Sequence, residues 1–565
     1  MLYLLFGVCA LLFTSSSGYA QSIDFTNLKN KKILKVTGGL NVNTLYNSYV
    51  PVATNKLSYF VNGTVQFDFL GLLSIPLNLN YSNRKFNYSQ PFSFNQFSIS
   101  PRYKWATAHA GTSSLTFSPY TLNGHQFQGG GLELSPSNWQ ISLMAGKLIR
   151  STNDSTFSRN GVGAKVVYKP GKYHVGMSVF HAADNPMSVT PERQEGLQTI
   201  PQKNWVLSFE GGYNSPKFGQ LEAEVATSFI SQNRVLEIGE PMREGIARIF
   251  FRSNAPIESK VAVKTKYSKP FNKGKTLVGV GYERVDPGYR TFGGYFFTND
   301  FENYTVHFTQ RLLGNKLAVS GNVGNQRDLL ETKANGQNRF VVSSRVTYMP
   351  SPKLNINAGY SNFRGFVFIR DLIQEVKRES SFIPIDTLNY TQINRNTNVT
   401  MTYSVRQTEK STQMLNLTGS ILEGASKQGE FIRTGQTSRV INLQGGYSLN
   451  MLASNTSFSL GYNLNNNKIA AQQSVAHGPT MILQQGFLGG KAQVSSSSTL
   501  LLTNTSGGIF TESLTASYRV SAKSNIQGTF LLMNNPASKQ GGEVGPNQAL
   551  PSTIVTTTIG YIFKF

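Results

Sequence analysis

Basic residues at alternate positions are the strongest candidates for chemistry in this sequence. Lys260, Lys264 and Lys266 are separated by even numbers of residues, so an extended strand would point their side chains to the same face. Ammonium groups that share one face attract anions, and rings of them are one basis of anion selectivity. The alternative is that they only solvate a wet face, with no selected substrate. The full set of such candidates is Lys165, Lys260, Lys264, Lys266, Arg339 and Arg345.

Residues that would carry catalysis or bind a metal are scattered. The six histidines include no metal-spaced pair such as His-Glu-x-x-His, and no Gly-x-Ser-x-Gly or P-loop motif occurs. A cluster that could bind calcium, or that simply solvates the end of a loop, consists of Asn299, Asp300, Glu302 and Asn303. We therefore expect no enzyme activity, no cofactor and no metal.

Alternating polar and apolar residues predict β-strands along most of the chain. Leu354, Ile356, Ala358 and Tyr360 alternate with small or polar residues, and similar segments of about ten residues recur, as tilted membrane strands require. After residue 20, no apolar run reaches the roughly 20 residues of a membrane-spanning helix. In lipid only a helix or a closed barrel satisfies its backbone, so the sequence predicts an all-β, closed antiparallel transmembrane barrel.

The connections between the strands alternate between short and long, which is typical of membrane barrels. Short turns include 170–172, 215–217 and 452–455, and long polar loops include 184–203, 286–299, 364–394, 422–437 and 534–551. Counting the strands between them predicts about 26, in a range of about 22 to 26, with short periplasmic turns and long extracellular loops.

Two long loops have apolar residues at helical spacing, in 244–253 and 368–379. We expect one or two short helices there, which either keep the loops compact or fold inward as a plug. A barrel of about 26 strands would be on the order of 50 Å across. Loops, a partner protein or a flattened cross-section must therefore narrow its pore. The candidate plug residues are Ile246, Ile249, Phe250, Leu372, Ile373 and Val376.

The C-terminal strand carries a specific pattern. A polar residue, a glycine and two aromatic residues occupy Thr558, Gly560, Phe563 and Phe565, the last residue. This pattern resembles the assembly signal of outer-membrane β-barrel proteins of Gram-negative bacteria. The resemblance implies an integral outer-membrane location and recognition by the barrel assembly machinery. The frequent Asn, Lys and Tyr resemble proteins of the Bacteroidota.

The N-terminus is typical of an export signal. Residues 2–13 are apolar, and the small residues Gly18 and Ala20 fit a signal-peptidase site. The sequence thus predicts a cleavable signal peptide at 1–20, a short periplasmic segment at 21–32 and a single barrel domain at 33–565. The only cysteine, Cys9, lies within the signal, so we expect no disulfide in the mature protein.

The formal net charge of +24 favours an anion-attracting lumen. We expect a porin-like outer-membrane channel for anionic or polar solutes. The first alternative is a barrel component of a surface-export or assembly machine, and the second is a surface adhesin or receptor that acts through its long loops. Expected partners are outer-membrane lipid and lipopolysaccharide, the assembly machinery and a periplasmic or surface protein, but no nucleic acid.

Overall fold

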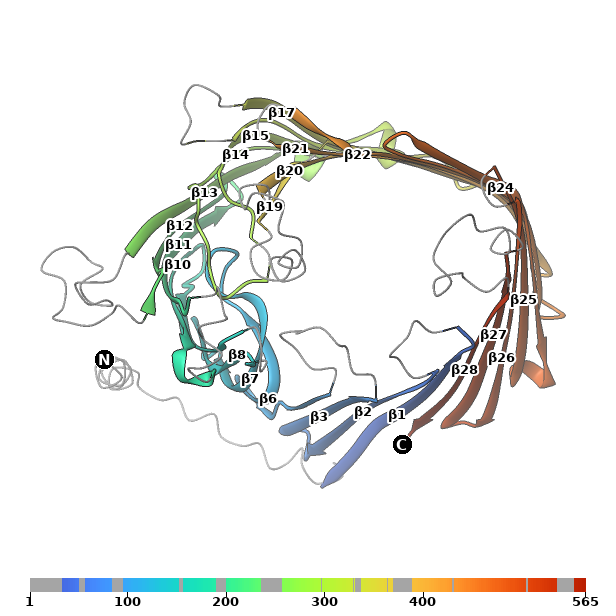
Figure 1. The fold of residues 1–565 in the computed structure, drawn as a ribbon, viewed down its shortest axis with the longest axis horizontal. Coiled ribbons are helices and arrows are strands. Elements are labelled where there is room, and N and C mark those ends of the chain that lie inside the picture. Colours follow the sequence, from blue (N-terminus) through green and yellow to red (C-terminus); the bar gives the residue numbers. More distant parts are fainter. Residues whose placement is uncertain are drawn as a thin grey trace, which may run out of the picture.

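The computed structural model describes residues 33–49, 56–83, 95–151, 156–189, 200–234, 257–295, 297–328, 330, 337–362, 364–368, 389–428, 431–504, 507–535 and 553–565. These residues form one closed ring of antiparallel strands (Figure 1). The predicted signal peptide and the 21–32 segment lie outside the described residues.

The first half of the ring contains β1 (Leu34–Asn47), β2 (Leu57–Phe69), β3 (Leu73–Ser82), β4 (Gln96–Ile99), β5 (Arg102–Tyr103), β6 (Ala106–Thr116), β7 (Asn123–Leu134), β8 (Trp139–Ile149), β9 (Ser158–Tyr168), β10 (Tyr173–Asn185), β11 (Lys203–Ser215), β12 (Gly219–Ser231), β13 (Ile257–Phe271) and β14 (Thr276–Val285).

The second half contains β15 (Phe301–Leu312), β16 (Leu317–Asp328), β17 (Gln337–Ser351), β18 (Leu354–Ser361), β19 (Arg364–Phe368), β20 (Asn389–Gln407), β21 (Ser411–Gln428), β22 (Phe431–Met451), β23 (Thr456–Ile469), β24 (Gln472–Phe487), β25 (Ala492–Thr503), β26 (Gly507–Ser521), β27 (Ser524–Asn534) and β28 (Thr553–Lys564).

The barrel wall has 26 strands, as the sequence predicted. Segments β4 and β5 both lie between β3 and β6, so they are two parts of one wall strand. Segments β18 and β19 both pair with β20 and form another. Each of the remaining segments is one complete strand of the wall.

The last strand closes the barrel against the first. Leu40 lies opposite Phe563, and Val42 lies opposite Tyr561, in an antiparallel register. The backbone N–H of Gly38 donates to the carbonyl of Phe565 at 3.2 Å. This pairing closes the barrel, as the sequence predicted.

The outward face of the wall is apolar over its central height. On β28, Ile559 and Tyr561 are exposed to the outside, while the intervening residues face the lumen. Aromatic pairs mark both margins of this band, such as Trp139–Tyr168 near the short turns and Tyr282–Tyr304 near the long loops. An apolar band between aromatic girdles fits only a barrel that spans a membrane, so this chain is an integral outer-membrane β-barrel.

Two predictions about the loops need correction. Residues 422–437 were expected to be a loop, but β21 continues to Gln428 and β22 begins at Phe431. Residues 364–368 and 389–394, within the other expected loop, are also strand. The reason is that a strand that rises above the lipid needs no apolar face, so its alternation fades there and it resembles a loop.

The predicted helices at 244–253 and 368–379 lie outside the described residues, apart from Phe368 at the end of β19. The part of the chain that the structure describes contains no α-helix, only short 3₁₀ turns such as Leu313–Asn315. None of the described helical segments is long or apolar enough to cross a bilayer.

Candidate functional site

Two chain segments fold inward against one arc of the barrel wall. The first inward segment, residues 117–122, connects β6 to β7, and the second inward segment, residues 286–295, follows β14. In Figure 1 the chain that follows β14 runs inside the ring toward β6, β7 and β8. Both segments therefore occupy space inside the described part of the barrel.

Hydrogen bonds join the two segments to each other. Leu122 and Gly293 form an isolated parallel bridge, and the N–H of Asn123 donates to the carbonyl of Gly293 at 2.8 Å. The Tyr289 hydroxyl donates to the carbonyl of Tyr120 at 2.9 Å. The two segments therefore form one unit rather than two independent loops.

A second set of bonds fixes this unit to the wall. The Asn204 side chain on β11 accepts from the N–H of Phe292 at 3.0 Å and donates to Ser228 Oγ on β12 at 2.8 Å. Ser228 Oγ in turn donates to the carbonyl of Arg290 at 2.6 Å. Asn204 and Ser228 are fully buried, so these bonds satisfy wall groups that would otherwise be costly to bury.

Apolar packing covers the same arc. Phe292 packs on Phe180 and Val206, which face inward from β10 and β11. Tyr120 and Tyr289 pack on a second cluster. Burying a large apolar side chain stabilises by about 1.5–3 kcal/mol, so the packing holds the segments more strongly than any one hydrogen bond. The apolar members of that second cluster on the wall are Ala226, Ala262, Val285 and Phe301.

The two packed tyrosines are strongly biased toward their neutral form. Burial raises the pKa of Tyr120 far above its ordinary value, and the negative charge of Glu283, which accepts from its hydroxyl, adds to the effect. Burial likewise raises the pKa of Tyr289, with a smaller contribution from Glu224. Both hydroxyls therefore remain hydrogen-bond donors at neutral pH.

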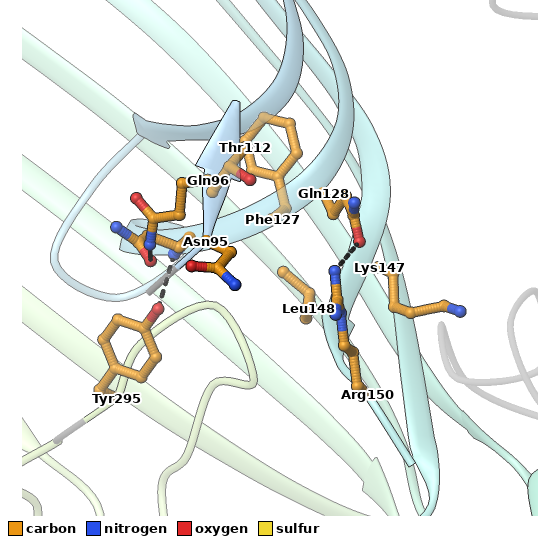
Figure 2. A pocket seen from close by; sticks show the side chains of 10 residues that line it. Asn95, Gln96, Thr112, Phe127, Gln128, Lys147, Leu148, Arg150 and Tyr295 are labelled. Atoms are coloured by element: carbon orange, nitrogen blue, oxygen red, sulfur yellow. Dashed lines mark hydrogen bonds between the residues drawn. The ribbon is translucent and has the colours of Figure 1, made fainter. Parts of the chain in front are cut away.

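The end of the second inward segment meets the top of β7 beside a small cavity. The Tyr295 hydroxyl accepts from the N–H of Gln126 at 3.0 Å, and its ring stacks on His125 at 4.1 Å between centroids. Figure 2 shows Tyr295 on one side of this cavity and the Arg150–Gln128 hydrogen bond on the other. The cavity is too small to serve as the solute path of a barrel this wide.

Three of the predicted lumen lysines lie beside glutamates on the same inner face. Lys165 Nζ contacts Glu210 Oε2 at 2.8 Å and also donates to the carbonyl of Phe117 in the first inward segment. Lys264 lies opposite both Glu224 on β12 and Glu283 on β14. Lys266 lies opposite Glu222. The inner wall of β9–β14 therefore combines both signs of charge, which the sequence analysis did not anticipate.

Of the other predicted lumen bases, Lys260 lies on the same strand as Lys264 and Lys266, whereas the two arginines lie apart from this group. Lys260 shares the inner face of β13, and its Cε lies 3.6 Å from the position that a Cβ on Gly288 would take. Arg345 lies opposite Gly359, on a separate part of the wall, and is exposed. Arg339 pairs through its backbone with Gln326. The structure thus brings Lys165, Lys260, Lys264 and Lys266 into one arc.

Many lysines lie in the short turns between neighbouring strands instead. The turn lysines are exposed, and no ion pair to them occurs within the described residues. Glu409 is the one acidic residue in those turns as described. The turn lysines are Lys104, Lys169, Lys172, Lys217, Lys273, Lys275, Lys316, Lys353, Lys410, Lys491 and Lys523.

The wall of β20–β25 has an uncharged polar inner face. Asn398, Ser420, Asn442 and Asn465 lie in one row across β20–β23. Asn442 donates to Ser420 Oγ at 3.3 Å, and Asn465 donates to Asn442. On the next strand pair, Thr480 and Thr499 hydroxyls are 3.0 Å apart. Such a surface hydrates readily without holding a charged solute.

The candidate plug residues at 246–250 and 372–376 lie outside the described residues, so their inward position stays a prediction.

The possible calcium cluster is not assembled, because Glu302 on the outer face is bonded to Arg327, Tyr282 and Tyr304. Asn299 instead donates to the carbonyl of Tyr289. Within the described residues no group of His, Cys, Asp and Glu could hold a metal ion.

Sequence reasoning missed the inward segments 117–122 and 286–295 as the narrowing element. A signal was present: Phe180, Ala182, Val206 and Ala226 are apolar at positions that alternation assigns to the lumen. Apolar residues on the inner face need a cover that excludes water. Reading both faces of β10–β12 would have predicted that cover.

No family model matches this chain, and no curated protein matches its sequence. Among solved structures, it is similar to a ferric enterobactin receptor (PfeA) variant from Pseudomonas aeruginosa, with 10% identity over 94% of this chain and 80% of that chain and a TM-score of 0.40. It is similar to the FrpB iron transporter from Neisseria meningitidis, with 10% identity over 96% and 83% of the two chains and a TM-score of 0.41. It is also similar to an E. coli P pilus tip assembly intermediate (PapC-PapD-PapK-PapG), with 11% identity over 94% and 61% and a TM-score of 0.46. At these levels the substrates and partners of those proteins do not carry over, and the resemblance to the Bacteroidota stays a prediction.

Proposed function

We propose that this protein is an outer-membrane channel for small polar solutes, narrowed on one side by the inward segments 117–122 and 286–295. The observation that carries the proposal is the double attachment of these segments, to each other and to the inner wall. A loop that is only packed for stability does not need to reach across several strands inside the barrel. Two inward segments that are fixed to the wall limit the size of the solutes that pass, while the wall itself stays rigid.

The polar inner face of β20–β25 supports the same proposal. Asparagine, serine and threonine side chains exchange hydrogen bonds with water at little cost, so a solute there loses few interactions when it moves on. Conduction requires binding that is weak enough to allow release.

The charges of the inner wall do not support a strong preference for anions. Lys264 and Lys266 would attract anions, but Glu222, Glu224 and Glu283 lie directly opposite them. The fields of these opposite charges largely cancel in the lumen, and salt screens what remains beyond about 8 Å at physiological ionic strength. We therefore propose selection by size and polarity, with at most a mild preference for anions.

Liposome swelling tests this function directly. Vesicles that contain the purified full-length barrel should swell in uncharged sugars up to a size limit, while vesicles without protein should not. Anionic and cationic solutes of equal size should enter at similar rates. An absence of swelling with every solute tested would contradict the proposal.

The exposed lysines of the short turns, which form no ion pair within the described residues, favour a second candidate, a barrel that docks an acidic periplasmic partner of an export or assembly machine. Exposed cations without partners raise the association rate with acidic surfaces. Purification under mild conditions would recover a stoichiometric acidic protein that is lost when Lys273, Lys275, Lys316 and Lys491 are changed to Gln. Recovery of the barrel alone would count against this candidate and would leave the channel proposal intact.

A further inference from the structure

A row of charged side chains crosses four neighbouring strands on the outside of the barrel. Arg395 on β20 lies opposite Glu423 on β21, Glu423 lies opposite Arg439 on β22, and Arg439 lies opposite Lys468 on β23. The register places all four on the same face as Leu417, Leu443 and Leu460, which are exposed to the lipid side. We call these four residues the outer row.

The outer row lies at the upper margin of the apolar band. Arg439 is ten residues above Leu449, which lies near the periplasmic end of β22. With a rise of about 3.4 Å per residue and a tilt of about 40°, this separation spans about 26 Å of membrane. The apolar band of an outer-membrane barrel is about 25 Å tall. The row therefore lies at the height of the headgroups of the outer leaflet.

The geometry of the row keeps two guanidinium groups in place. Glu423 Oε1 lies 3.2 Å from Arg439 Nε, and Glu423 Oε2 lies 3.8 Å from Arg395 Nη1. Both arginine side chains stay more than half exposed, at 62% and 55%. One carboxylate against three cations leaves an excess of two positive charges within the row. The exposed parts of these side chains lie on the outer face of the barrel.

We propose that the outer row binds the phosphate groups of an outer-leaflet lipid. Arginine forms strong, charge-assisted hydrogen bonds with phosphate. The apolar side chains directly below the row, such as Ile441 and Leu443, would contact the acyl chains of the same molecule. A soluble phosphate would use only the charges, whereas a phosphate-bearing lipid uses both surfaces, so the lipid is the occupant that fits.

A second cluster on the outer face provides a matched control. Arg284 contacts Asp286 at 3.2 Å, and Arg327 contacts Glu302 at 2.6 Å. Two arginines are balanced there by two carboxylates, so the cluster has no excess charge to offer a phosphate. It faces outward near the same end of the barrel, on β14–β16.

Binding of defined lipids to the purified full-length barrel tests the proposal. Native mass spectrometry in detergent would compare diphosphorylated lipid A with the same lipid after removal of its phosphates. We expect the wild-type barrel to retain the phosphorylated lipid preferentially. A basic residue near a membrane surface contributes about 1 kcal/mol to anionic lipid binding, so the triple variant Arg395→Gln, Arg439→Gln, Lys468→Gln should lose on the order of a hundredfold in affinity. The control Arg284→Gln, Arg327→Gln should bind as the wild type does.

Three results would overturn the proposal. The triple variant could bind like the wild type, the phosphates of the lipid could make no difference, or inorganic phosphate at the same concentration could displace the lipid completely. The last result would identify a soluble anion as the occupant. The variant Glu423→Gln separates folding from binding, because it removes a negative charge at the same place and should strengthen lipid binding. Weaker binding by Glu423→Gln would also contradict the proposal.

Discussion

The Tyr120 hydroxyl donates a hydrogen bond of 2.6 Å to Glu283 Oε1 and so connects the first inward segment to β14. Glu283 lies three residues before Asp286, where the second inward segment leaves the wall. The hydroxyl of Tyr289, which lies in that segment, donates a hydrogen bond to the carbonyl of Tyr120. The three residues close a loop of contacts through which the wall holds both inward segments together.

The substitution Tyr120→Phe removes the bond to Glu283 while keeping the ring. A hydrogen bond to a charged group contributes about 1.5–3 kcal/mol, so the first inward segment should open more often by a comparable free energy. Hydrogen exchange of the backbone amides at 117–122 would accelerate about tenfold or more. The control Tyr561→Phe, on the lipid-facing surface, should leave these amides unchanged. Equal exchange in Tyr120→Phe and the wild type would show that the bond does not hold the segment.

The contact between Gly293 and the first inward segment leaves no room for a methyl group. A Cβ on Gly293 would lie 2.5 Å from the carbonyl oxygen of Thr121 and 2.8 Å from Cα of Leu122. Gly293→Ala should therefore push the two segments apart and cost about 1–3 kcal/mol, as overpacking does. Protease susceptibility within the segments would report this separation. Gly445→Ala, where the nearest side-chain atom is at 3.8 Å, should have no such effect, and equal susceptibility in the two variants would contradict the close packing.

Alkaline pH should release the inward segments. The pKa values of Tyr120 and Tyr289 are raised above the ordinary value of 10.0 by burial, so folding around the neutral phenols is fully stabilising below pH 10. Above pH 10 the two phenols would ionise when the segments are released. The stabilisation of the packed segments therefore falls as pH rises. Protease susceptibility within the segments should increase above pH 10 in the wild type. The double variant Tyr120→Phe, Tyr289→Phe should show much less pH dependence, and an identical profile in both proteins would refute the role of the two phenols.

Much of the wall could be predicted from sequence because strand alternation is a local property. The pairing of β28 with β1 follows from an even strand count, and the outward direction of Ile559 and Tyr561 follows from their spacing. The inward segments depend on contacts between residues more than 160 positions apart, such as Thr291 and Thr121. No local pattern encodes such a contact.

The charge of the lumen shows the same limit. Alternation places Lys264 and Lys266 on one face of their strand, but Glu283 becomes a neighbour of Lys264 only when the strand register is known. The outer row could not be predicted from the sequence for another reason. Glu423 is in a stretch that resembles a loop, and its partners Arg395 and Arg439 come together only through the pairing of long strands.

A carboxylate in the lipid-facing band offers a test of the wall itself. Glu512 faces outward on β26, six residues above Tyr518, or about 16 Å inside a band of about 25 Å. The Ser496 hydroxyl donates to it at 2.7 Å, and Ser498 also donates to it. Glu512→Gln keeps an acceptor without the charge, so the free energy of unfolding should rise by about 1 kcal/mol.

Denaturant unfolding of the barrel in lipid vesicles would measure this change. Glu512→Lys, the control of opposite charge, should lower the free energy of unfolding by about 2–4 kcal/mol. A loss of stability in Glu512→Gln would contradict this prediction, because it would show that hydrogen bonds to the charged carboxylate outweigh the cost of placing the charge in the apolar band.

If the second inward segment narrows a conducting channel, its removal should widen the path for solutes. Single-channel recording in planar bilayers would compare the wild type with a variant in which residues 289–295 are replaced by a short Gly-Ser linker. We expect stable conductance in the wild type, and in the variant a larger conductance and a higher size limit for uncharged sugars. Equal conductance in the two proteins, or no conductance in either, would contradict this expectation.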